Sequence, residues 1–429
     1  MNALNIGAWS GLRSLVREAG FLARDRALLL WVLVVLGLSS VAVWAGLSEV
    51  RQQRASIAQL LEADRQDRHS QFAAQSDWGS AAYYSFHLTY DPPADFAFAA
   101  LGLRDLLPWK HRLRMLALEG QIYEQDVGNP VLALVGRFDF AFLAAMLLPL
   151  ILIFLLHDLR AAERTAGRHD LLVAVAGNAR TVWWWRAGLK SAAIGVAALL
   201  PLWVAGLVSG TAPMVLLAAT GLVAVHLLFW MAVCVGLAAW QRPAAVILTA
   251  LVGLWLVLGT LLPAAGRTAI EAAVPIPSGA EILLTQREAV NDAWDLPVAA
   301  TMRPFLARHP EWAGERPIGE GFDWAWYYAF QQVGDQTAEP LSERYRAGRM
   351  ERDRLAGLLA WLAPPALVER ALQRLARTDL RAALAYEERV RAFHARLRAF
   401  YYPGLFRGEP FEPSALARLP EFSADAAAD

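Results

Sequence analysis

The sequence has a single cysteine, Cys234, in 429 residues, and only 19% of its residues are charged. One cysteine excludes an intrachain disulfide framework and a cysteine-rich zinc site. The 40 basic and 40 acidic side chains give no net charge, which excludes a strongly basic nucleic-acid-binding protein and an acidic tail protein. Soluble proteins have about a quarter of their residues charged, so this chain has few charges for its length.

Sequence motifs for nucleotide, metal or acyl-transfer chemistry are also missing. The chain has no G-x-x-x-x-G-K-[ST] phosphate loop, no H-E-x-x-H zinc motif and no G-x-S-x-G nucleophile elbow. We therefore expect a protein that is not an enzyme, with no catalytic residues, no bound metal and no directly bound cofactor. Any nucleotide energy that drives it has to come from another chain.

The apolar residues are concentrated in blocks without Asp, Glu, Lys or Arg. The longest block has 51 residues, between Lys190 and Arg242. About 20 apolar residues in a helix cross a hydrocarbon core of about 30 Å, and a turn-forming cluster at 209–213 divides the longest block. Buried helices of a large soluble protein rarely need uncharged runs of this length. We predict five membrane-spanning helices, at residues 27–47, 138–157, 187–208, 213–239 and 243–265.

Arginine is concentrated at one set of ends of these predicted spans. Residues 1–26 contain four arginines, and residues 157–190 contain five arginines and one lysine, whereas the loop at 209–212 has no charge. Basic loops stay in the cytoplasm, which places the N-terminus inside and the C-terminus outside. The first run is longer than a signal-peptide core and no A-x-A site follows it, so we expect an uncleaved anchor. The predicted cytoplasmic parts are residues 1–26 and 158–186, and the predicted extracytoplasmic parts are residues 48–137 and 266–429.

Both outer segments have helical patterns. The first opens with a polar helical stretch at 51–68, and a short strand is expected within 83–90. In the second, three runs of apolar residues at helical spacing begin at Leu355, Leu367 and Leu384, and prolines separate or end them, the last at Pro403. The predicted fold class is an all-α polytopic membrane protein with about five transmembrane helices and two large, mainly helical extracytoplasmic segments.

Apart from His157 at the end of the second span, two Asp, Glu or His residues fall inside the predicted spans, Asp139 near the other end of the second and His226 in the middle of the fourth. Ion-coupled carriers usually place such groups in the membrane, and their scarcity argues against a secondary carrier. If the protein is such a carrier, both residues are essential for transport. The simpler interpretation is that Asp139 caps a helix together with Arg137 and that His226 hydrogen-bonds to a neighbouring helix.

The predicted cytoplasmic link is rich in charge. Residues 157–172 carry mixed charges at helical spacing, a glycine and then two leucines, which predicts a short amphipathic helix on the membrane surface. Two interpretations are open. The arginines only fix the orientation of the protein, or the helix docks a soluble partner.

Several short motifs occur in a particular order along the chain. They are Gly-Arg-Phe-Asp at 136–139, Leu-Pro-Leu at 148–150, Glu-Arg-x-x-Gly at 163–167, Thr-Asp-Leu at 378–380 and Arg-Ala-Phe-Tyr-Tyr-Pro at 398–403. Together they resemble the ABC-2-type permeases, in particular a subgroup with large extracytoplasmic domains of unknown function found in bacterial ABC export systems.

This resemblance covers most of residues 119–405 and implies an exporter permease subunit in the bacterial inner membrane. The implied partners are a separate ABC ATPase subunit that hydrolyses ATP, a second permease copy or a sibling permease, and membrane lipid. The resemblance places the contact with the ATPase at Asp158, Glu163, Arg164, Gly167 and Arg168. The chain differs from such families in having five predicted spans rather than six, and an arginine at 168 where a threonine is usual.

A second hypothesis is a non-transporting interaction protein, whose spans transmit the conformational changes of an ATPase to an envelope partner. The large mass outside the membrane favours this alternative. The sequence identifies neither the transported substrate nor the choice between homodimer and heterodimer.

Overall fold

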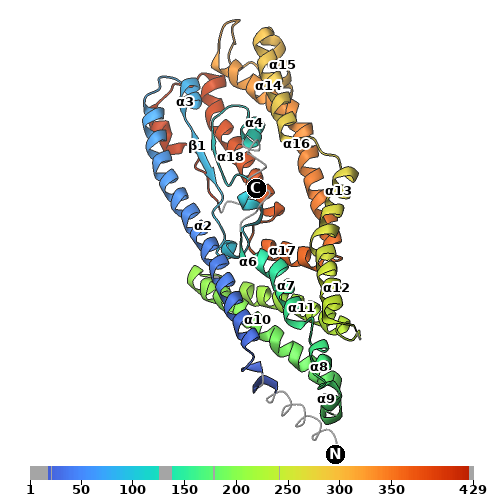
Figure 1. The fold of residues 1–429 in the computed structure, drawn as a ribbon. Helices are drawn as coiled ribbons and strands as arrows, with labels where there is room; N and C mark the ends of the chain where they lie inside the picture. Colours follow the sequence, from blue (N-terminus) through green and yellow to red (C-terminus); the bar gives the residue numbers. More distant parts are fainter. Residues whose placement is uncertain (1–17, 21, 125–137, 177–178, 241, 425–429) are drawn as a thin grey trace, which may run out of the picture.

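The computed structural model describes residues 18–20, 22–124, 138–176, 179–240 and 242–424 of the chain. Five helices are long and apolar enough to cross a membrane, and a larger part of the chain extends beyond one end of them (Figure 1). The five are Arg26–Ala73, Phe140–Thr165, Val182–Ser209, Pro213–Leu237 and Ala244–Ala273. This confirms the predicted fold class and gives the architecture of a multi-pass membrane protein. We call the larger part the large domain, the adjoining end of the spans the domain end, and the opposite end the loop end.

The first span is part of a much longer helix. α2 (Arg26–Ala73) is continuous over 48 residues, which makes it about 70 Å long at the helical rise per residue. Figure 1 shows it running from the loop end along the side of the large domain. Asp25 caps its N-terminus by accepting hydrogen bonds from the N–H groups of Ala27 and Leu28. The predicted span at 27–47 and the polar helix predicted after it therefore form one element.

The third and fourth spans form a hairpin. α10 (Ala179–Ser209) begins earlier than the predicted span, and α11 (Pro213–Leu237) follows a tight turn. Gly210 in this turn has a φ of 79°, a conformation that glycine adopts without strain. The turn predicted at 209–213 is thus confirmed.

Two spans contain a π-helical turn directly before a Leu-Pro pair. The second span consists of α6 (Phe140–Phe142), the π turn η4 (Leu143–Leu147) and α7 (Leu148–Leu156), and the fifth of α12 (Ala244–Leu256), the π turn η5 (Val257–Leu261) and α13 (Leu262–Ala273). Proline has no N–H to donate to the preceding turn and its ring crowds that turn, so the helix widens there. The widened turns lie together, because a Cβ on Gly259 would be 3.1 Å from Cε of Met146.

The spans differ in how deeply they are buried. In the most apolar stretch of the second span 67% of the residues are buried, against 11% in the fifth. The second span is therefore the centre of the bundle, and the fifth lies at its edge.

The large domain combines two stretches of sequence. The first stretch contains α3 (Trp78–Tyr84), β1 (His87–Tyr90), η1 (Ala97–Ala99), η2 (Gly102–Asp105), β2 (Lys110–Leu113) and α4 (Leu118–Tyr123). The second contains α14 (Gly279–Asp295), α15 (Val298–Arg308), η6 (Pro310–Trp312), α16 (Trp324–Ala360), α17 (Pro364–Leu375), α18 (Leu380–Arg407) and η7 (Pro413–Arg418). β1 and β2 pair antiparallel with His87 opposite Leu113, so the predicted short strand is present and has a partner.

The helix–proline–helix–helix pattern predicted for the C-terminal part is confirmed, with one correction. α16 ends at Ala360, and α17 starts at Pro364, the first helical position, where a missing N–H costs nothing. However, α18 does not end before Pro403. It continues through this proline to Arg407, and Gly408 then ends it in a left-handed conformation (φ 69°).

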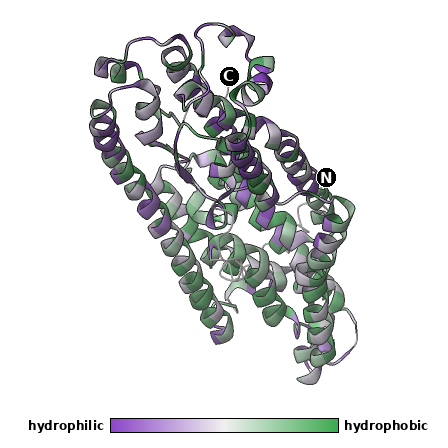
Figure 2. Ribbon diagram, turned by 90° about the horizontal axis from the view of Figure 1, so that it is seen from above, coloured by the Kyte–Doolittle hydropathy of each residue, from purple (hydrophilic) through white to green (hydrophobic). Residues whose placement is uncertain are grey.

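α17 joins the large domain to the spans. Its residues Val368 and Leu372, and Ala376 directly after it, belong to the same buried apolar cluster as the span helices. Figure 1 shows α17 lying across the domain end of the spans. The core of the large domain is a separate cluster, rich in aromatic side chains from α3, α16 and α18. Figure 2 shows the corresponding division, with hydrophobic residues concentrated along the spans.

Gly46 allows close packing where α2 leaves the bundle. A Cβ at this position would overlap the carbonyl oxygen of Phe98, whereas a Cβ on Gly37 of the same helix would have no heavy atom within 4 Å. We expect Gly46→Ala to lower stability by about 1–3 kcal/mol, because a backbone group has to move. Gly37→Ala should be neutral or stabilising by up to about 1 kcal/mol through helix propensity. Thermal unfolding of both variants in detergent checks this, and equal melting temperatures would contradict it.

Candidate functional site: a charged hairpin at the loop end

The predicted cytoplasmic link forms two short helices instead of one amphipathic helix. α8 (Ala161–Thr165) and α9 (His169–Ala176) are separated at Gly167, whose φ is 68°. The Gly167 N–H donates to the Arg164 carbonyl at 3.0 Å, and the Arg168 N–H to the Glu163 carbonyl at 3.0 Å. This is a Schellman ending, in which the left-handed residue is usually glycine. Gly167 therefore sets the angle between the two helices.

Glu163 lies at the centre of an ion-pair cluster. Its side chain is nearly buried, and its two oxygens are 2.8 Å from Nε of Arg168 and 2.9 Å from a terminal nitrogen of Arg186. Arg186 lies on α10 and also pairs with Glu18 at 2.7 Å. The cluster therefore ties the hairpin to the third span and to residue 18, just before α2.

Aromatic stacking adds to this junction. His169 stacks on the buried ring of Trp183 with ring centroids 6.0 Å apart. The guanidinium groups of Arg160 and Arg186 also lie against this ring, as cation–π contacts do. α9 is thus held against the start of α10.

The other two residues predicted at the ATPase contact lie outside this cluster. Arg164 donates to the carbonyls of Trp240 and Arg242, at 3.4 and 3.3 Å, and so reaches the link between the fourth and fifth spans. Asp158 is half-buried, and its carbonyl accepts from the N–H of Ala162 at 2.8 Å. The sequence does not predict that Arg186 and Glu18 belong to this site, because charge counting uses them only to orient the spans. Their signal was weak, because nothing local links positions so far apart.

Asp139 is a capping residue. It precedes α6 and accepts hydrogen bonds from the N–H groups of Phe142 (2.9 Å) and Leu101 (3.0 Å). The first bond is an N-cap, and the second joins the span to the large domain. The capping interpretation is confirmed, while its proposed companion Arg137 lies outside the described residues.

His226 hydrogen-bonds to a neighbouring span, as predicted. Its Nε2 lies 3.2 Å from the carbonyl of Ala145, and Nε1 of Trp255 lies 3.1 Å from the carbonyl of Met146. Both carbonyls belong to the π turn before Pro149. Because a carbonyl only accepts, Nε2 of His226 has to carry the proton. Pro149 has no N–H to donate to the carbonyls of this turn, and the side chains of His226 and Trp255 donate to two of them instead.

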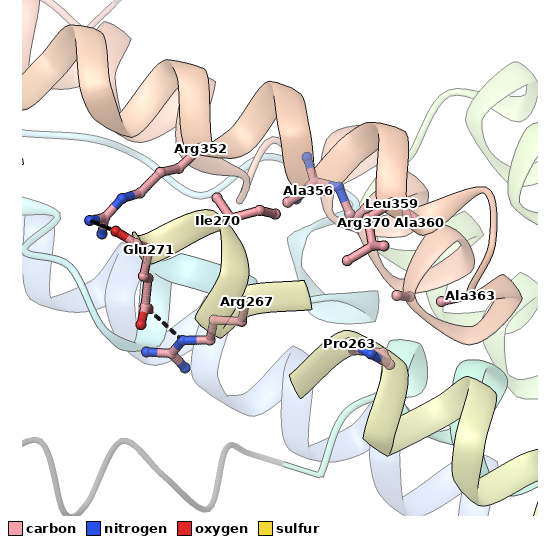
Figure 3. A pocket seen from close by; sticks show the side chains of 11 residues that line it. Pro263, Arg267, Ile270, Glu271, Arg352, Ala356, Leu359, Ala360, Ala363 and Arg370 are labelled. Atoms are coloured by element: carbon pink, nitrogen blue, oxygen red, sulfur yellow. Dashed lines mark hydrogen bonds and ion pairs between the residues drawn. The ribbon is translucent and has the colours of Figure 1, made fainter. Parts of the chain in front are cut away.

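Two cavities lie where the large domain meets the spans. The first, about 280 Å³ in volume, is mainly apolar and lies between α13 and the α16–α17 corner (Figure 3). Its arginines are engaged: Arg267 pairs with Glu271 at 2.8 Å, and Arg370 with Asp353 at 2.6 Å. The second cavity is larger, is lined by polar and apolar groups in similar amounts, and lies between the α10–α11 turn and the α17–α18 turn.

Comparison with known proteins identifies only the C-terminal part. Residues 280–425, about a third of the chain, match a family described as a domain of unknown function (DUF3526). Comparison with curated proteins and with solved structures gives no match. Within the described ranges, no group of three or more His, Cys, Asp or Glu side chains is arranged to hold a metal ion.

Proposed function

We propose that the chain is the permease subunit of an ABC-2-type exporter and that a separate ATPase subunit supplies the energy of ATP hydrolysis. The observation that carries the proposal is the Glu163 cluster. It makes the hairpin at the loop end mechanically continuous with the third span, as a coupling segment requires. The motif resemblance supports it, whereas the match at residues 280–425 is to a domain of unknown function and identifies no transporter family. In this proposal the loop end is cytoplasmic, because the flanking arginines lie there.

The contacts of Glu163 and Arg164 determine how a movement of the hairpin would reach the spans. An ATPase that moves α8 and α9 would pull on Arg186 of α10 through Glu163 and on the link before α12 through Arg164. The spans would then tilt as a group. We propose that the protein acts in the bacterial inner membrane with a second permease copy or a sibling permease, and binds no cofactor itself.

The expected result is that Arg186→Met uncouples the ATPase. The protein is purified with an ABC ATPase subunit, taken from an adjacent gene where one is found, and the ATPase rate is measured with and without the permease. The buried Arg186–Glu163 pair transmits the movement, so its loss should lower the permease-dependent rate about tenfold, the size of a typical coupling free energy.

Arg267→Gln is the control. It removes an ion pair with Glu271 at the domain end of the fifth span, away from the ATPase contact, and the Arg267 side chain is 81% exposed, so the pair contributes little. A change of less than about twofold is expected. Failure of the two proteins to associate, or unchanged coupling in both Arg186→Met and Glu163→Gln, would overturn the proposal.

A second candidate is a non-transporting protein that passes ATPase strokes to an envelope partner. The continuous α2 helix favours it, because one rigid rod joins the loop end to the far side of the large domain. Reconstituted vesicles that move a solute would count against this candidate. A stable complex with an envelope enzyme, without transport, would favour it.

A further inference from the structure

A cavity of about 880 Å³, lined by both polar and apolar groups, opens between the large domain and the domain end of the spans. Its lining on the span side comes from Thr211 and Ala212 in the α10–α11 turn and from Val215 in the first turn of α11. The hydroxyl of Thr211 donates to the carbonyl of Asp95 at 3.0 Å, which fixes this turn against the large domain. A turn that joins two spans lies where the hydrocarbon ends, so the cavity is at the depth of the lipid headgroups.

The acidic residues of the cavity are already occupied. Asp91 pairs with Arg104 and with Arg389, each at 2.6 Å, and Asp95 pairs with Arg54 at 2.7 Å. Asp379 caps α18 by accepting from its first turn.

Three arginines of the cavity remain. Arg374, Arg377 and Arg381 are exposed, and none of them forms an ion pair with the part of the chain that the structure describes. They lie at the end of α17, in the following turn and at the start of α18. This wall of the cavity therefore carries three arginines without an ion-pair partner and one carboxylate, that of Asp379, which leaves an excess of positive charge.

Arg377 occupies a backbone position that favours glycine. Its φ is 54°, and it is the only residue other than glycine with a positive φ in the described ranges. It ends α17 in a Schellman motif, with the Thr378 N–H donating to the Gln373 carbonyl at 3.0 Å. The turn is held firmly, because Thr378 also bonds to the carbonyl of Ala100 at 2.8 Å. An arginine here is strained, and such strain is typical of functional positions.

Arg381 is also at an unfavourable position for folding. It lies in the first turn of α18, which starts at Leu380, and the partial charge of a helix N-terminus is positive. Two of the three arginines thus lie where local energetics disfavour them. A bound anion would offset both costs.

We propose that this cavity binds a phosphate ester through Arg374, Arg377 and Arg381. Arginine matches phosphate geometry with paired hydrogen bonds. Phe96, Val215 and Leu375 give the cavity an apolar side next to the spans, which suits a phosphate attached to a lipid. The same chemistry is available in a soluble phosphate ester. This inference goes beyond the proposed function and does not depend on an ATPase.

The test uses the full-length protein and has two arms, both with a phosphate-free background. In the first, nanodiscs contain phosphatidylglycerol diluted in a galactolipid, and native mass spectrometry counts the phosphatidylglycerol that the protein retains. In the second, glycerol 3-phosphate is titrated by calorimetry into the protein in dodecyl maltoside. Retained phosphatidylglycerol identifies a lipid headgroup as the source, and binding of glycerol 3-phosphate identifies a soluble ester.

Arg377→Gly is the decisive variant. Glycine fits the left-handed position better, so the variant should melt at an equal or higher temperature, and yet bind phosphate about tenfold more weakly, as expected for one lost charged hydrogen bond. Arg381→Gln should weaken binding similarly, and Arg303→Gln, an exposed arginine on α15, should not. Absence of binding in both arms, or wild-type binding by Arg377→Gly and Arg381→Gln, would overturn the proposal.

Discussion

Asp335→Ala is expected to lower the free energy of unfolding of the large domain by about 3–5 kcal/mol, because it leaves a largely buried arginine without its partner. Asp335 lies on α16, and its Oδ2 is 2.5 Å from a terminal nitrogen of Arg398 on α18. Its carboxylate also accepts from the N–H groups of Leu118 (2.7 Å) and Glu119 (3.0 Å) at the start of α4, and from Nε2 of Gln286 on α14 (3.1 Å). One side chain therefore joins four helices.

The measurement is denaturant unfolding in detergent, followed by tryptophan fluorescence. Glu339→Ala is the matched control, one turn further along the same helix. Glu339 pairs with Arg308, but both side chains are about half exposed, at 47% and 52%, and such pairs contribute about 1 kcal/mol or less. Similar losses in the two variants would show that Asp335 is not the organising residue.

Acidification is expected to destabilise the large domain through buried neutral histidines. Burial and the nearby Arg68 charge lower the pKa of His87 to about 3, and burial lowers the pKa of His111 to about 4. Burial likewise lowers the pKa of His394. Neither ring nitrogen of His87 has a hydrogen-bond partner among the described residues. No hydrogen bond there would offset the cost of adding a proton to the buried ring.

The direction of the effect follows from proton uptake. Above pH 6.5 these histidines are neutral in both the folded and the unfolded chain, and they have no effect. Below that pH the unfolded chain binds protons that the folded chain excludes, and each histidine removes up to about 1.4 kcal/mol of stability per pH unit. The loss from His87 continues until the pH approaches its folded pKa of about 3.

His87→Phe isolates one of these contributions. The ring lies near Phe393 and Tyr401, so an aromatic replacement should be accommodated. Between pH 6.5 and 4.5 the wild type should lose roughly 2–3 kcal/mol more than the variant. Carboxylates that titrate in this range affect both proteins equally and cancel in the difference. Parallel pH profiles for the two proteins would contradict the assignment.

The sequence predicts the membrane part of the fold well, because its signals are local. A run of about 20 residues without charge is sufficient to indicate a span, and Gly210 or Pro364 marks a boundary through its own backbone preferences. Local signals were misleading where tertiary packing compensates for them. α18 continues past Pro403, and Gly167 divides a segment whose charge pattern predicts one helix.

The candidate site was only partly predictable. Glu163 and Arg168 were named from the motif, but the burial of Glu163 depends on Arg186 and Glu18, which are distant in sequence. Charge counting in the flanks treats these residues as interchangeable. Only their positions in space show that one arginine connects the hairpin to the third span.

The sequence by itself determined five helices that are long and apolar enough to cross a membrane, since hydrophobic runs and caps act on neighbouring residues. The tertiary structure decided what those elements do together. It placed α17 across the ends of the spans and three arginines around one cavity. It also placed His226 beside the carbonyl of Ala145, which receives no hydrogen bond from the proline at 149. These arrangements join residues far apart in the chain, and no local pattern specifies them.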